Sequence, residues 1–290
     1  GVSSAASDVY KRQGYYLPEP SRWPIVGSIG IFFLAFGAVL TMNAVSGGWY
    51  VVLVGALVMT YMLFGWFGAV IGESESGKYN KQVDVSFRWS MSWFIFSEVM
   101  FFAAFFGALF YMRVLSVPWL SDADTGSLLW EGFVAAWPTD GPGVDSKFTP
   151  MGAWGLPAIN TALLLTSGVT ITVAHWALKE GKRGLLNWFM FLTIALGVLF
   201  LGLQVLEYVH GYRDLGLTLE SGAYGATFYM LTGFHGFHVT LGTIMLIVIW
   251  LRGVKGHFKP EAHFGFEGVA WYWHFVDVVW LGLFIFVYWL

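Results

Sequence analysis

The stretch that decides the fold is residues 185–209, LLNWFMFLTIALGVLFLGLQVLEYV, in which every residue from Leu196 to Leu203 is apolar or glycine. About 20 mainly apolar residues cross the hydrocarbon core of a bilayer as a helix. Inside hydrocarbon every backbone polar group must be satisfied by the protein, and a helix does this within a single segment. Residues 185–209 are therefore predicted to form a membrane-spanning helix.

Six other stretches have the same character. The seven predicted spans lie at about 24–45, 49–71, 89–114, 153–178, 186–209, 223–251 and 266–289. A transmembrane β-barrel would instead show alternating segments of about ten residues, and none is present in the sequence. The predicted fold class is all-α, a polytopic membrane protein with seven transmembrane helices.

The composition supports the same class and excludes others. The chain is 57% hydrophobic and 11% charged, whereas a soluble domain carries about 25% charged residues, so a cytosolic enzyme is excluded. Nucleic-acid binding requires a basic surface, which a net charge of −3 does not provide. The absence of cysteine excludes disulfides, thiolate nucleophiles, Fe–S clusters and copper sites built on thiolates.

The spacing of the spans predicts the domain organisation. Residues 1–13 do not begin with Met and lack an apolar core, so a non-native or disordered segment is expected there. We then expect a two-helix bundle at 14–72, a cytoplasmic loop at 73–88, and a five-helix bundle at 89–290 with a long outer loop at about 115–152. Most Lys and Arg residues fall on one side of the spans, which predicts a cytoplasmic N-terminus and a C-terminus on the outer side.

Ionisable residues inside the spans are candidates for function, because burying them in a membrane is costly. They are Glu98, Glu207, His235, His238, Glu267, His274 and Asp277. Glu98 is either an acid that handles protons or a neutral acid hydrogen-bonded to a neighbouring helix.

The histidines allow further interpretations. His235 and His238 share a helix face and suit a metal or haem, but two histidines are too few alone. Partners such as Glu207 across helices are therefore the simpler explanation for both. His274 and Asp277 are most simply a local hydrogen bond, and a proton relay is the alternative.

A basic group follows the sixth span and contains Arg252, Lys255, His257 and Lys259. Such groups attract anionic lipid headgroups, although the general bias of positive charge toward the inner side also explains it. Nucleotide-binding, nucleophile-elbow and zinc-protease motifs are absent. The residues by themselves predict no catalytic site and no metal site in this chain.

Several ordered motifs resemble one family. They are Ser97-Glu98-Val99-Met100-Phe101-Phe102, Pro157-Ala158-Ile159-Asn160-Thr161, Thr232-Gly233-Phe234-His235-Gly236-Phe237-His238-Val239, His263-Phe264-Gly265-Phe266-Glu267 and Ala270-Trp271-Tyr272-Trp273-His274-Phe275-Val276-Asp277. From about Tyr15 to Leu290 the chain resembles cytochrome c oxidase subunit III, of a bacterial type.

The resemblance implies a non-redox core subunit of a proton-pumping oxidase in a bacterial plasma membrane, with a periplasmic C-terminus. Subunit I would pack directly on it and hold haems and copper, and subunit II would hold copper and receive electrons from cytochrome c. The family places phospholipids in a V-shaped cleft between the first two helices and the other five. It also implies support for proton uptake and turnover stability, and a route for oxygen. The chain itself would hold no cofactor except bound phospholipid.

The resemblance also assigns roles to single residues. Glu98 matches a carbodiimide-reactive acid of the family, while Arg252 and His257 match headgroup-binding positions, which extends the lipid interpretation to Lys255. Glu73 aligns with an acid at the end of the second span and is expected to belong to the lipid-binding residues. The chain departs from the family pattern in two places. Residues 68–72 lack charges that the resemblance implies, including an arginine expected at Gly72. His175-Trp176 stands where the family often has two adjacent histidines.

Three alternatives remain. A quinol-oxidising relative of the same family would differ mainly in its partner subunits. A free-standing proton-coupled transporter would use Glu98 and the His235/His238 pair, but the sequence lacks the internal repeats that transporters often carry. A self-contained metal-dependent membrane oxidase would need several clustered histidine motifs.

Overall fold

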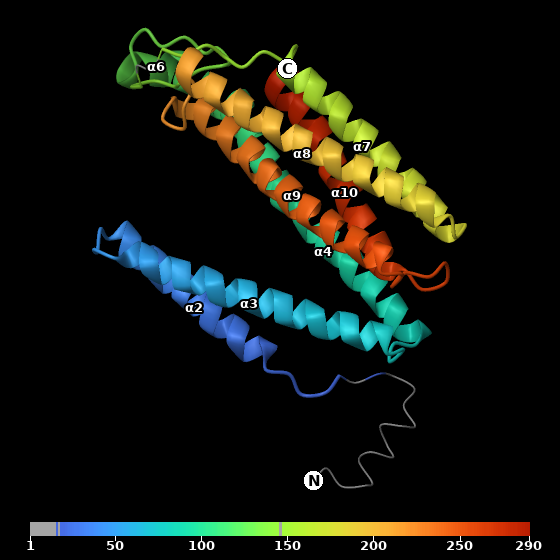
Figure 1. The fold of residues 1–290 in the computed structure, drawn as a ribbon. Coiled ribbons are helices and arrows are strands. Elements are labelled where there is room, and N and C mark those ends of the chain that lie inside the picture. Colours follow the sequence, from blue (N-terminus) through green and yellow to red (C-terminus); the bar gives the residue numbers. More distant parts are fainter. Residues whose placement is uncertain (1–15, 17, 145–146) are drawn as a thin grey trace. The chain divides into compact units, whose positions relative to one another are not determined.

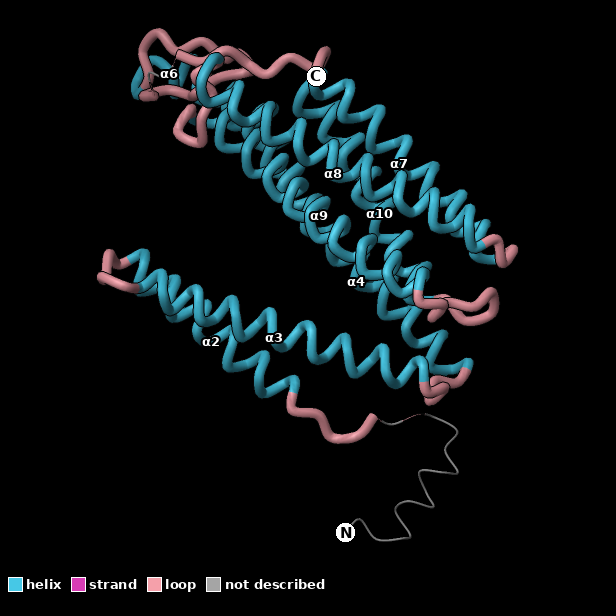
Figure 2. Tube along the Cα trace, viewed as in Figure 1, coloured by secondary structure: helices cyan, strands magenta, loops and turns pink. Residues whose placement is uncertain are grey.

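The computed structural model describes Tyr16, residues 18–144 and residues 147–290, and the segment expected to be non-native, 1–13, lies outside them. Figure 2 shows that the described chain is helical, with loops confined to the connections. Its long helices are α2 (Trp23–Met42), α3 (Gly48–Glu75), α4 (Lys81–Phe110), α7 (Leu156–Lys179), α8 (Arg183–Asp214), α9 (Gly222–Val254) and α10 (Phe264–Leu283). These correspond to seven candidate membrane spans. The prediction of an all-α protein with seven transmembrane helices is confirmed.

The helices extend further than the apolar stretches. Within the loop expected at 73–88, α3 continues to Glu75 and α4 begins at Lys81, so most of these residues are helical. The outer connection also begins later than 115, since a π-helical turn, η1 (Tyr111–Ser116), and a short helix, α5 (Val117–Leu120), continue α4. Polar residues at the end of a span can stay helical in the interface or in water. Hydropathy therefore locates the membrane-crossing part of a helix but not its ends.

The chain divides into two compact units, residues 1–87 and residues 88–290. In the first unit, α2 and α3 form an antiparallel hairpin. A β-carbon added at Gly37 would lie 2.5 Å from the backbone nitrogen of Val52, and one added at Gly55 would lie 2.6 Å from that of Leu34. Small residues let transmembrane backbones approach this closely, so these two glycines set the spacing of the hairpin.

The second unit is a helical bundle in which α10 packs against both α7 and α9, while α8 packs against α7 and α9 (Figure 1). A six-residue π-helical turn, η2 (Phe284–Trp289), follows α10, and the short α6 (Ala123–Leu129) lies in the outer connection. In the most apolar stretch of the last span, half of the residues are buried, a larger share than in any other candidate span. The centre of this unit is therefore α10.

Trp273 of α10 shows how the bundle is packed. Its side chain is fully buried, and β-carbons added at Gly197 of α8 and Gly242 of α9 would lie 2.8 Å and 2.9 Å from its ring atoms. Its indole Nε1 donates a hydrogen bond to Ser167 Oγ of α7 at 2.9 Å. One indole thus contacts three other helices, and the two glycines make the space that it fills.

Candidate functional site

Glu98 of α4 lies beside His238 of α9, although 140 residues separate them in the chain. His238 Nε2 lies 2.9 Å from Glu98 Oε2, and the two side chains are 8% and 22% exposed. The other ring nitrogen, His238 Nδ1, donates to the carbonyl oxygen of Phe234 at 2.6 Å. Since Nδ1 keeps its hydrogen, the contact between Nε2 and the carboxyl group contains one further proton. That proton resides either on His238, giving an ion pair, or on Glu98, giving a neutral pair.

Aromatic rings surround the histidine of this pair. The centroid of the His238 ring lies 5.0 Å from that of Phe102, 5.8 Å from that of Phe101 and 6.4 Å from that of the stacked Tyr272 ring. An apolar surrounding strengthens the electrostatic interaction between the two partners and penalises any charge left without its partner. The arrangement therefore suits a group that exchanges one proton while staying paired.

His235 has different partners, although it lies only one helical turn before His238. It is fully buried, its Nε2 donates to the carbonyl oxygen of Val276 at 3.2 Å, and its ring packs against Phe200 and Trp280. The two histidines do have partners on other helices, Val276 of α10 for His235 and Glu98 of α4 for His238, whereas Glu207, named as one such partner, bonds to neither. The two imidazoles are held by different helices and do not converge on one metal ion.

The remaining acids of the last span lie in separate groups. His274 Nδ1 is 3.6 Å from Asp277 Oδ2, an ion-pair distance slightly longer than a hydrogen bond, and His274 Nε2 is 3.2 Å from Thr172 Oγ1. Because the Thr172 hydroxyl donates to the carbonyl oxygen of Gly168 at 2.9 Å, it accepts from His274. The predicted buried polar residues thus form several local pairs.

The basic group after the sixth span belongs to a folded turn. The guanidinium of Arg252 lies over the Phe258 ring, 4.6 Å from its centroid, and Lys255 is exposed while His257 is half-buried. Arg183, which sequence reasoning did not select, donates from Nη2 to the carbonyl oxygen of Phe258 at 2.5 Å. This contact ties the start of α8 to the turn that follows α9.

In the first unit, the Glu73 carboxylate accepts a hydrogen bond of 2.7 Å from the Tyr79 hydroxyl. Burial, together with this bond and the negative charge of Glu73, raises the pKa of Tyr79 above its ordinary value. A β-carbon added at Gly68 or Gly72 would meet nothing within 4 Å. Both glycines, which lie in the segment predicted to lack charges, therefore have open space around them.

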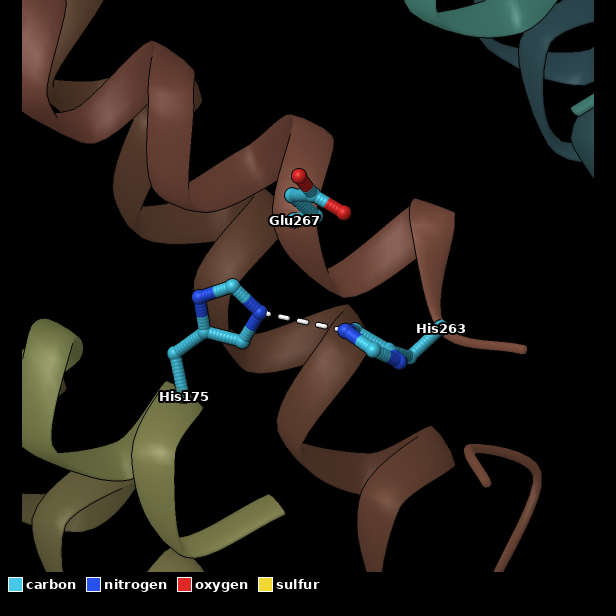
Figure 3. Close-up of side chains that lie close together, drawn as sticks. All are labelled: His175, His263 and Glu267. Carbon is cyan, nitrogen blue, oxygen red and sulfur yellow. Dashed lines mark hydrogen bonds between the residues drawn. The ribbon is translucent and has the colours of Figure 1, made fainter. Parts of the chain in front are cut away.

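A group that sequence reasoning missed lies at the ends of α7 and α10. Figure 3 shows the imidazoles of His175 and His263 facing each other, with the Glu267 carboxylate beside them. His175 Nε2 and His263 Nε2 are 3.1 Å apart, and Arg88 Nη1 lies 2.7 Å from Glu267 Oε1. The only sequence signal is the spacing of His263 and Glu267, which puts them one turn apart at the start of a helix.

Comparison with known proteins gives consistent results. The model of the family described as cytochrome c oxidase subunit III matches residues 13–290. Cytochrome c oxidase subunit 3 of Marchantia polymorpha is 38% identical over 97% of this chain and 98% of the relative. The corresponding protein of Prototheca wickerhamii is 39% identical, over 96% and 98%. That of Halichoerus grypus is 37% identical, over 97% and 98%.

These matches extend over nearly the whole length of this chain and of each relative. They therefore include α4 and α9, which contain the Glu98–His238 pair, and α10. The fold agrees with them, since the described residues contain seven helices of transmembrane length. The chain belongs to the cytochrome c oxidase subunit III family and is a subunit of an oxidase complex.

Proposed function

We propose that this chain supplies protons to, and stabilises, the redox-active subunit of a proton-pumping cytochrome c oxidase, without a redox centre of its own. The observation that carries the proposal is the Glu98–His238 contact of 2.9 Å. This contact holds one exchangeable proton beside the aromatic rings that pack around His238. No other described acid in a span is paired with the histidine of another helix at this distance.

The partners in this proposal follow from the family. Subunit I packs directly against this chain and contains the haems and a copper, while subunit II contains the other copper and receives electrons from cytochrome c. The exposed apolar side chains of α4, among them Trp89, Trp93 and Met100, suit contact with lipid chains or with helices of another subunit. The location proposed is the bacterial plasma membrane, with the Lys/Arg-rich side facing the cytoplasm.

The partner proposal is tested by purifying the tagged chain gently from its native membrane. We expect it to elute with two larger subunits and to show haem a bands in a reduced-minus-oxidised spectrum. Mass spectrometry would identify the partners. A chain that elutes alone and colourless would contradict the proposal and favour a free-standing transporter.

Phospholipid binding is the second part of the proposed role of this chain. A substitution at Arg252 tests it. Arg252→Ala is expected to lower phospholipid retention and speed inactivation during turnover, because a basic residue near the membrane surface contributes about 1 kcal/mol to binding anionic lipid. Lipid extracted from the purified complex would be counted per haem. Arg213→Ala, at the other end of the bundle, is the matched control. Equal lipid content in all three proteins would contradict a role for Arg252.

A further inference from the structure

The Lys/Arg-rich ends of α7 and α10 bring together three side chains that suit a metal ion. One ligand atom from each of His175, His263 and Glu267 lies within 4.8 Å of the other two. In Figure 3 the two imidazoles face each other across a short gap and the carboxylate stands over one side of it. All three residues and their neighbour Arg88 belong to the second unit.

His263 has the second contact that metal-ligating histidines commonly make. His263 Nδ1 donates to the carbonyl oxygen of Lys259 at 3.1 Å, so in the neutral ring the lone pair is on Nε2, which points at His175. Metal-ligating histidines commonly donate their second ring N–H to a carbonyl or carboxylate in this way. Two nitrogens bound to one tetrahedral zinc ion at 2.0–2.1 Å are about 3.3 Å apart. The observed Nε2–Nε2 separation of 3.1 Å is close to that value.

Glu267 can serve as the third ligand while it remains bound to Arg88. The ion pair with Arg88 uses Oε1, and a carboxylate has a second oxygen. A ligating carboxylate that is also hydrogen-bonded by an outer residue is usual in metal sites. The group offers a single carboxylate, too few oxygen ligands for a hard cation such as Ca²⁺, whereas imidazole ligands suit zinc.

We propose that His175, His263 and Glu267 bind one Zn²⁺ ion, with a water molecule as the fourth ligand. Three protein ligands and one water complete the tetrahedral set that zinc prefers. The ion would link the last turn of α7 to the first turn of α10. The site is separate from the Glu98–His238 pair, and its role does not depend on the proton supply proposed above.

The test uses the intact purified complex after treatment with EDTA. The complex is dialysed against graded concentrations of Zn²⁺, and bound zinc is counted per haem by mass spectrometry. We expect His175→Ala and His263→Ala each to lose one zinc equivalent, or to bind it at least ~10-fold more weakly. His210→Ala is the matched control, because His210 pairs only locally with Asp214 and should keep the wild-type number.

Equal zinc binding by the wild type and both site variants would overturn the proposal, and so would an equal loss in His210→Ala. Haem content per polypeptide checks that the variants still assemble. A second measurement does not need the variants to fold. X-ray absorption of the zinc-loaded wild type should show nitrogen or oxygen neighbours at about 2.0–2.1 Å together with scattering from two imidazole rings. A spectrum without imidazole scattering would also overturn the proposal.

Discussion

Glu98→Gln is expected to abolish carbodiimide labelling of the chain and to lower oxidase turnover at high electron supply, while leaving the haem spectrum unchanged. Glutamine has the shape of glutamate and can still hydrogen-bond to His238 Nε2, which lies 2.9 Å from Glu98 Oε2. It cannot take up or release the proton that the pair contains. Even where the original bond is that of an ion pair, replacing it by a neutral one costs about 1 kcal/mol, which is too little to prevent assembly.

Turnover and proton uptake of the purified complex measure this effect. Glu207→Gln is the control, since Glu207 is also fully buried in a span but bonds to neither His235 nor His238. We expect it to keep wild-type proton uptake. Loss of the haem spectrum in Glu98→Gln would instead make Glu98 a structural acid, and unchanged labelling and turnover would remove it from proton supply. His238→Gln should reproduce the turnover defect if the two residues act as a pair.

Trp273→Ala is expected to have the largest effect on stability, a loss of about 3–5 kcal/mol in the free energy of unfolding. The indole is fully buried and is the side chain against which Gly197 and Gly242 pack. Helices in a membrane associate through packing and hydrogen bonds, so removing the ring leaves a cavity shared by α8, α9 and α10. The bond to Ser167 of α7 is lost as well.

Unfolding of the chain in mixed detergent, followed by circular dichroism, measures this loss. Trp188→Ala removes the same side chain from α8 at a position that is 60% exposed, and it should leave the unfolding midpoint nearly unchanged. Trp273→Phe keeps most of the packing but loses the hydrogen bond, so an intermediate midpoint is expected. Equal midpoints for Trp273→Ala and Trp188→Ala would mean that α10 is not the centre of the bundle.

Some features of this protein follow from the order of residues alone. Hydropathy is a property of neighbouring residues, so apolar stretches such as 185–209 predicted the seven spans without any knowledge of contacts. The motifs around Glu98, His238 and His274 pointed to the family for the same reason, because each is a continuous run in one helix. Hydropathy did not locate the ends of α3 and α4, where polar residues continue the helix.

The tertiary structure decided which side chains of different helices contact each other. Which side chains meet depends on the rotation of each helix about its axis and on where two helices cross, and neither is encoded in a local pattern. Glu98 and His238 are 140 residues apart, and His175 and His263 are 88 residues apart. The sequence identified Glu98 and His238 as candidates, yet it named Glu207 as an example of a partner for the histidines and left His175 and His263 outside any site. Packing around α10 brought His175 to His263 and turned His235 and His238 toward different helices.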